Sequence, residues 1–221
     1  MNPPSSAALD TWAGRELNPQ RAAAIKKHSG GSFLDVGCGN GRYVSHFSTS
    51  HTTFGVDAHA YDEWGDLPEQ FKVADARSLP FDDNSFDTVV SFEMLEHMDD
   101  PATVLREFRR VCSKNIILSV PNCRLLPGME KSRLTYYHYT DETHCNFYDL
   151  DSLRRLVEAQ GFRVVEKRLI NPVNLAPLLN EAFVGPAVLW RKMLQYFGRN
   201  QYYMTCLLIA AKPDAAAVHA E

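Results

Sequence analysis

The sequence predicts an α/β fold in which a doubly wound, mostly parallel seven-stranded sheet carries helices on both faces. Two observations predict it. Seven short apolar runs follow one another along the chain, and helical segments, bounded by glycine, proline or aspartate, fill the gaps between them. Alternating strands and helices favour parallel pairing, so ligand sites are expected at the carboxyl ends of the strands.

The predicted strands are short apolar runs of the kind that is buried inside a sheet. The last of them is expected to run antiparallel to its neighbours. The predicted strands are 32–37, 52–57, 71–75, 86–92, 114–122, 162–170 and 203–212.

Helices are predicted at 18–30, 101–112 and 149–162 from their patterns and end signals. Proline stands near the first turn of the first helix and opens the second, where its missing N–H costs nothing. For the third helix, Asp149 or Asp151 suits the N-cap, and Gly161 suits the stop.

The length suits one domain. A chain of 221 residues that is 45% hydrophobic can bury one substantial core but is short for two. We expect a flexible N-terminus at 1–14, a single domain at 15–212 and a disordered tail at 213–221. Residues 171–201, rich in Pro, Leu, Phe and Trp, are predicted to form a helical lid inserted before the last strand. The alternative is that their apolar side chains pack on the sheet or form a homodimer contact.

Composition narrows the classes of partner and compartment. The formal net charge of -4 gives no basic field for DNA or anionic lipid, although a local patch can hide within that sum. Five scattered cysteines without a C-x-x-C pair indicate reduced thiols rather than zinc or disulfides. The N-terminal residues do not resemble a signal peptide, and no apolar run approaches the ~20 residues of a transmembrane helix. A cytoplasmic protein is therefore expected.

The stretch "FLDVGCGNGRY" runs from a predicted strand into Gly37, Gly39 and Gly41. Glycines at this spacing let the backbone approach a nucleotide-like ligand closely at the start of a helix. The dinucleotide-binding fingerprint requires a further glycine at position 42, where Arg42 stands. The loop therefore predicts a nucleotide-like ligand of a different kind.

With Asp35 before the loop and Asp57 at the next strand end, the pattern resembles the class I methyltransferases that use S-adenosylmethionine. The resemblance covers roughly residues 15–170 and implies a Rossmann-like methyltransferase fold and a catalysed methyl transfer. It also implies that Asp57 accepts both ribose hydroxyls and that Asp75 receives the adenine amino group. A non-catalytic cofactor-binding protein of the same fold is the alternative. The implied cofactor-binding residues are Asp35, Gly37, Cys38, Gly39, Gly41, Asp57, Asp75, Ala76 and Phe92.

Directly after the fourth predicted strand, the stretch "EMLEH" holds Glu93, Glu96 and His97. At about 100° per residue, these positions would share one face of a single helical turn. Two carboxylates in a cleft repel each other unless one pKa rises or a cation binds between them. Carboxylate oxygens suit Mg²⁺ or Mn²⁺, and the imidazole also admits Zn²⁺, Fe²⁺ or Co²⁺.

The same stretch is similar to the ubiquinone-pathway O-methyltransferases, and its E-x-x-E-H pattern to the small-RNA 3'-terminal 2'-O-methyltransferases. In the latter a downstream histidine completes a magnesium site, and here His138 and His144 follow the fifth strand. The resemblance implies a metal site of Glu93, Glu96, His97 and His144, with His97 and His144 as catalytic residues. Two alternatives stay open: the cluster only braces its loop, or one histidine is a metal-free general base.

These features predict an S-adenosylmethionine-dependent O-methyltransferase that is assisted by Mg²⁺ or Mn²⁺. A divalent ion lowers the pKa of a bound hydroxyl, and a neighbouring hydroxyl of the acceptor can chelate the same ion. The expected acceptor is a hydroxyl of a sugar, an oligosaccharide or other glycan, or another small vicinal diol. A polyprenyl catechol or quinol is the alternative. RNA is disfavoured because RNA binding should show clustered Lys and Arg.

Overall fold

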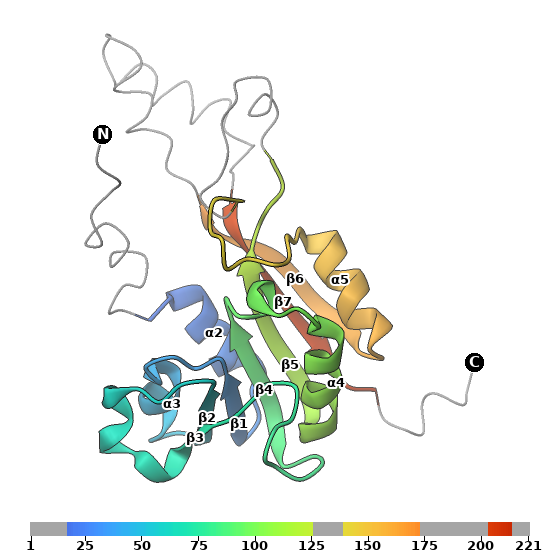
Figure 1. Cartoon of the computed structure of the whole chain (residues 1–221). Helices are drawn as coiled ribbons and strands as arrows, with labels where there is room; N and C mark the ends of the chain where they lie inside the picture. Colours follow the sequence, from blue (N-terminus) through green and yellow to red (C-terminus); the bar gives the residue numbers. More distant parts are fainter. Residues whose placement is uncertain (1–16, 126–138, 173–202, 214–221) are drawn as a thin grey trace, which may run out of the picture.

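The computed structural model describes residues 17–125, 139–172 and 203–213, which form one seven-stranded sheet with helices on both faces (Figure 1). The strand order is β3-β2-β1-β4-β5-β7-β6. Strands β1 to β5 pair in parallel, and β7 runs antiparallel to both β5 and β6. The predicted doubly wound, mostly parallel sheet with an antiparallel last strand is confirmed.

Each strand begins and ends within two residues of its predicted boundary. β6 reaches Pro172, so the first two residues of the predicted lid belong to a strand. The rest of the lid, the predicted N-terminal segment and all but the first residue of the predicted tail lie outside the described residues. The strands are β1 (Ser32–Val36), β2 (Thr52–Asp57), β3 (Phe71–Val73), β4 (Phe86–Phe92), β5 (Cys112–Pro121), β6 (Arg163–Pro172) and β7 (Tyr203–Ala211).

The described helices have the end signals that the sequence led us to expect. Asn18 caps the first helix by accepting from two backbone amides, and Pro19 occupies its first turn. Of the two candidate caps for the last helix, Asp149 is the one used, in a capping box with Ser152. The helices are α2 (Pro19–His28), α3 (Arg42–Phe47), α4 (Pro101–Val111) and α5 (Leu150–Ala159), and short 3-10 turns are η1 (Asp62–Asp66), η2 (Pro68–Gln70) and η3 (Leu95–His97).

Two apolar layers hold the helices against the sheet. One layer contains Leu105 and Phe108 of α4 and Leu153 of α5, and the other contains Ile25 of α2 and Phe47 of α3. All five side chains except Phe47 are fully buried, so each face of the sheet is covered by its own pair of helices (Figure 1). This arrangement leaves the carboxyl ends of the parallel strands as the edge at which loops can build a site.

Two further expectations concerned membrane-spanning helices and the state of the cysteines. Among the residues that the structure describes, no helix is long and apolar enough to cross a membrane. All five cysteines are free thiols, and only Cys145 is exposed.

Gly41→Ala is expected to lower the free energy of unfolding by about 2–5 kcal/mol. A left-handed backbone costs an L-residue about 1–2 kcal/mol, and Gly41 has a φ of 76°. An added Cβ would also lie 2.4 Å from Phe71, a buried ring stacked on Trp64, and overpacking typically costs about 1–3 kcal/mol. Urea unfolding measures the loss. Gly39→Ala is the matched control, because its Cβ would meet nothing within 4 Å and only the backbone cost of about 1–2 kcal/mol remains. Equal losses in the two variants would contradict the packing argument.

Candidate active site

The glycine loop between β1 and α3 is held in an open, left-handed path. Gly37, Gly39 and Gly41 all have positive φ, of 75°, 52° and 76°. The Gly39 amide donates to Oδ2 of Asp57 at 2.8 Å, and Nε1 of Trp64 donates to the Gly39 carbonyl at 2.8 Å. The loop is therefore hydrogen-bonded to the end of β2, while a Cβ added at Gly39 would meet nothing within 4 Å. A ligand can approach the backbone there without meeting a side chain.

Two acidic residues, Asp35 of β1 and Asp57 of β2, lie next to this loop. Asp35 is buried in β1, and its pKa is raised to about 7, mainly by burial and then by the negative charge of Asp57, whereas Arg21 lowers it. Negative charge at this place suits a cationic ligand such as a sulfonium, which S-adenosylmethionine carries. Asp35 and Asp57 lie near neighbouring strand ends, and the cofactor-binding roles implied for them stay predictions.

The other implied cofactor residues differ in what they contact. Asp75 is exposed after β3, and its carboxylate accepts hydrogen bonds from Arg77 at 2.8–3.1 Å, which lower its pKa. Arg77 also reaches Asp99 at 3.1 Å, so an adenine amino group would share Asp75 with this arginine. Ala76 packs against the core beneath. Cys38 is buried, and burial raises the pKa of its thiol, so it acts as an apolar support of the loop.

Glu93 corrects one expectation. We expected "EMLEH" to form one helical turn with its three polar side chains on one face, and this is wrong. The turn begins at Leu95, whereas Glu93 has a φ of 54° and stands outside it. Its carboxylate pairs with Arg21 of α2 and accepts from Oγ of Ser119 at 3.0 Å. The same guanidinium lies 5.4 Å from the ring centroid of buried Phe92. The sequence contained no signal for Arg21, which approaches only because α2 packs on this part of the sheet.

Three of the four implied metal ligands do come together. Glu96, His97 and His144 each offer a ligating atom, and these atoms lie within 4.8 Å of one another, a group that does not include Glu93. The two imidazole rings meet edge to face with centroids 4.7 Å apart. Ligand atoms about 2.1 Å from a common ion in tetrahedral geometry lie about 3.4 Å apart, so these side chains would have to move together by up to about 1.4 Å to hold one ion.

Hydrogen bonds bring the distant histidine to this group. The backbone amides of Cys145 and Asn146 donate to the carbonyl of Glu96 at 2.8 and 3.0 Å. Nδ1 of His97 lies 3.0 Å from the hydroxyl and 3.2 Å from the carbonyl of Thr143. A carbonyl partner requires Nδ1 to carry the proton, which leaves the lone pair on Nε2 to face Glu96. The loop after β5 is thus held against η3.

Glu96 carries the unusual electrostatics of the site. Its side chain is buried, and its Oε2 atom has no hydrogen-bond partner among the described residues. Burial raises the pKa of Glu96, and the nearby charge of Glu93 raises it further. Burying an unpaired carboxylate is costly, so the group either takes a proton or receives a cation. Two neighbouring imidazoles make a divalent cation a good chemical fit.

Comparison with known proteins identifies the family. A family model described as "Methyltransferase domain" matches residues 11–167, most of the chain. The chain belongs to this methyltransferase domain family. The matched residues include the glycine loop and the end of β2, and the family supports S-adenosylmethionine as the cofactor.

Two relatives of this chain are named as O-methyltransferases. An O-methyltransferase of Aspergillus sclerotiorum is 28% identical over 74% of this chain and 66% of its own length. A ubiquinone biosynthesis O-methyltransferase of Aeromonas salmonicida is 29% identical over 82% of this chain and 84% of its own. The match thus falls just short of two thirds of the fungal protein's length.

A solved structure confirms the fold of the methyltransferase. A SAM-dependent methyltransferase from Archaeoglobus fulgidus aligns with a TM-score of 0.63 at 19% identity, covering 94% of this chain and all of its own. At that identity the likeness concerns the fold, and the predicted Rossmann-like methyltransferase fold is confirmed.

Proposed function

We propose that this methyltransferase transfers a methyl group from S-adenosylmethionine to a hydroxyl, assisted by a divalent ion that Glu96, His97 and His144 bind. The observation that carries the proposal is the buried carboxyl group of Glu96, which lies beside two imidazoles and whose Oε2 atom has no partner among the described residues. The similarity to relatives named as O-methyltransferases supports oxygen as the methyl acceptor.

The donor set favours one of the two expected ions over the other. Two imidazoles and one carboxylate suit Zn²⁺, Fe²⁺, Co²⁺ or Mn²⁺, whereas Mg²⁺ prefers oxygen ligands and keeps several waters. With Glu93 paired to Arg21, one oxygen ligand of the expected set is already engaged. Among the expected ions we therefore favour Mn²⁺ over Mg²⁺.

The residues of the chain have separate tasks in this mechanism. Asp57 holds the glycine loop open and is the proposed acceptor for the ribose hydroxyls. The Thr143 contact keeps the His97 ring in one orientation, and Asp141, 3.6 Å from Nε2 of His144, orients the second ring. A divalent ion at this group would supply Lewis acidity that lowers the pKa of the acceptor hydroxyl. The rest of the rate enhancement comes from holding that hydroxyl in line with the sulfonium methyl group.

The proposed acceptor carries two adjacent hydroxyls, because a second hydroxyl can chelate the same ion. We retain a sugar, oligosaccharide or other small vicinal diol as the first choice. The ubiquinone biosynthesis relative gives a specific reason to keep a polyprenyl catechol or quinol as the second. The predicted lid or dimer segment that would distinguish them, 171–201, lies almost wholly outside the described residues.

Metal removal tests the proposal directly. Metal-stripped protein with S-adenosylmethionine and a panel of catechols, quinols and sugar diols is expected to release S-adenosylhomocysteine at least ~100-fold more slowly than protein given Mn²⁺, Co²⁺ or Zn²⁺. Mg²⁺ should restore less activity than Mn²⁺. Turnover that EDTA leaves unchanged would contradict metal assistance. Cofactor binding without turnover on any acceptor, with metal present, would favour a non-catalytic protein.

A further inference from the structure

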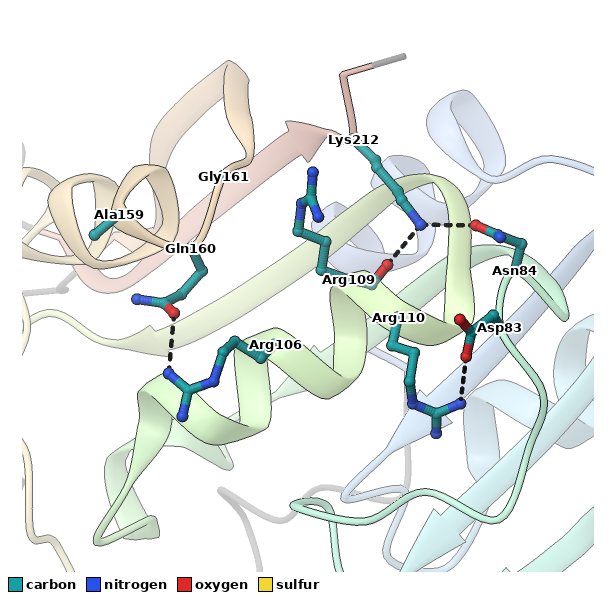
Figure 2. Close-up of a pocket in the computed structure, with 9 residues that line it drawn as sticks. All are labelled: Asp83, Asn84, Arg106, Arg109, Arg110, Ala159, Gln160, Gly161 and Lys212. Atoms are coloured by element: carbon teal, nitrogen blue, oxygen red, sulfur yellow. Dashed lines mark hydrogen bonds and ion pairs between the residues drawn. The ribbon is translucent and has the colours of Figure 1, made fainter. Parts of the chain in front are cut away.

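A hollow of about 690 Å³ lies at the end of the sheet opposite the candidate active site. Its walls come from the last turns of α4 and α5, the residues just before β4 and the residue after β7 (Figure 2). These segments adjoin the amino ends of β4 and β5, whereas the glycine loop and η3 follow carboxyl ends. A volume of several hundred Å³ is typical of sites for small molecules.

The lining of this hollow is strongly basic in a chain of net charge -4. Arg106, Arg109, Arg110 and Lys212 line it, and Asp83 is the one carboxylate among the described lining residues. The local excess of three positive charges favours an anionic ligand.

The four cations differ in what they already bind. Arg110 is saturated by Glu107, Asp83 and two backbone carbonyls. Lys212 donates to the carbonyls of Arg109 and Cys112 and to Asn84, all neutral oxygens. The contacts of Lys212 satisfy two carbonyl oxygens at the carboxyl end of α4. Cations in the last turn of α4 also complement the helix dipole.

Arg109 also stands in the last turn of α4, but its side chain lacks the acceptors that Arg110 and Lys212 have. Its guanidinium makes no hydrogen bond or ion pair with the described residues, and its Nε atom is buried without a partner. Its side chain lies against Gly161, where an added Cβ would meet Nε at 3.1 Å. Figure 2 shows the guanidinium between Gly161 and Lys212 with no dashed line to it. Arg109 as a whole is half-buried, and a buried N–H donor without an acceptor is costly, so an incoming oxygen at this side chain would be bound favourably.

Neighbouring groups extend the set of donors. Arg106 donates to Oε1 of Gln160 at 3.3 Å and to the hydroxyl of Thr103 at 2.6 Å, both neutral partners. Because this amide oxygen is occupied, the amide nitrogen of Gln160 is left to donate. The wall therefore offers guanidinium and amide donors around one space.

We propose that this hollow binds the phosphate group of a small phosphorylated molecule, with Arg109 as the principal donor. A guanidinium matches two phosphate oxygens at once, and the hollow is much larger than a phosphate ion alone. Because the site lies away from the glycine loop, its ligand does not compete with the cofactor. It is thus a second site, separate from methyl transfer.

The test uses the full chain in chloride buffer at constant ionic strength, titrated with inorganic phosphate and with glycerol 3-phosphate by calorimetry. We expect saturable binding of both, tighter for the ester, and at least ~10-fold weaker binding in Arg109→Gln. Arg109→Lys should be intermediate, and Asp83→Asn should bind more tightly because a repelling carboxylate is removed. S-adenosylhomocysteine affinity should stay within 2-fold with phosphate present.

Arg154→Gln is the matched control, since Arg154 pairs with Glu158 on α5 outside the hollow. It should bind phosphate as the wild type does, and equal unfolding midpoints in chloride show that the Arg109 variants remain folded. Equal affinity of wild type and Arg109→Gln, or no saturable binding up to ~50 mM of either probe, would overturn the proposal. Binding of inorganic phosphate as tight as that of the ester would overturn the assignment to a phosphorylated molecule.

Discussion

His144→Ala is expected to remove the bound divalent ion and to lower kcat/KM for methyl transfer by at least ~100-fold. Loss of a mere hydrogen-bond partner of a metal ligand already costs about 10–100-fold, and here a ligand itself is removed. The ring of His144 is one of only three groups within reach of a common ion among the described residues. Metal content by mass spectrometry and S-adenosylhomocysteine release measure the two effects.

Two control variants separate the three roles open to His144. His46→Ala removes an exposed histidine on α3 and should leave metal content unchanged. Glu93→Gln should also retain the ion, because Glu93 pairs with Arg21 outside the group. If His144→Ala lost activity but the wild type held no metal, a general base would be the better assignment. If the variant lost only stability, the cluster would be a structural brace.

Asp57→Asn is expected to weaken cofactor binding by about 10–100-fold. A hydrogen bond to a charged group contributes about 1.5–3 kcal/mol, and the substitution removes both the charge and one acceptor for the ribose hydroxyls. Asparagine is preferred to alanine because its remaining oxygen can still accept from the Gly39 amide, which Oδ2 of Asp57 does at 2.8 Å. The loop is thus retained while the proposed ribose contact is weakened.

Calorimetry with S-adenosylhomocysteine measures this loss, with Asp62→Asn, an exposed carboxylate in η1, as the control. Unchanged affinity in Asp57→Asn would mean that the ribose lies elsewhere. Equal weakening in both variants would indicate a general effect of negative charge near the site rather than a contact of Asp57.

Much of the fold could be predicted because its information is local. Buried parallel strands are apolar throughout, so each strand is a recognisable run, and its neighbours end at glycine, proline or a capping side chain. The positions of Asp35, the three loop glycines and Asp57 then follow, since parallel strands end at a common edge. The proximity of Glu96, His97 and His144 was also predicted, but from resemblance to a known motif.

The sequence by itself therefore determined the strands, their order of appearance, the glycine loop and the family to which the chain belongs. Only the tertiary structure decided the partner of Glu93, because Arg21 lies 72 residues away and reaches it through the packing of α2. It also decided that Nε of Arg109, beside Gly161, meets no acceptor in the part of the chain that the structure describes. Such pairings depend on which side chains meet across elements, and hydrophobic periodicity within one element carries no information about that.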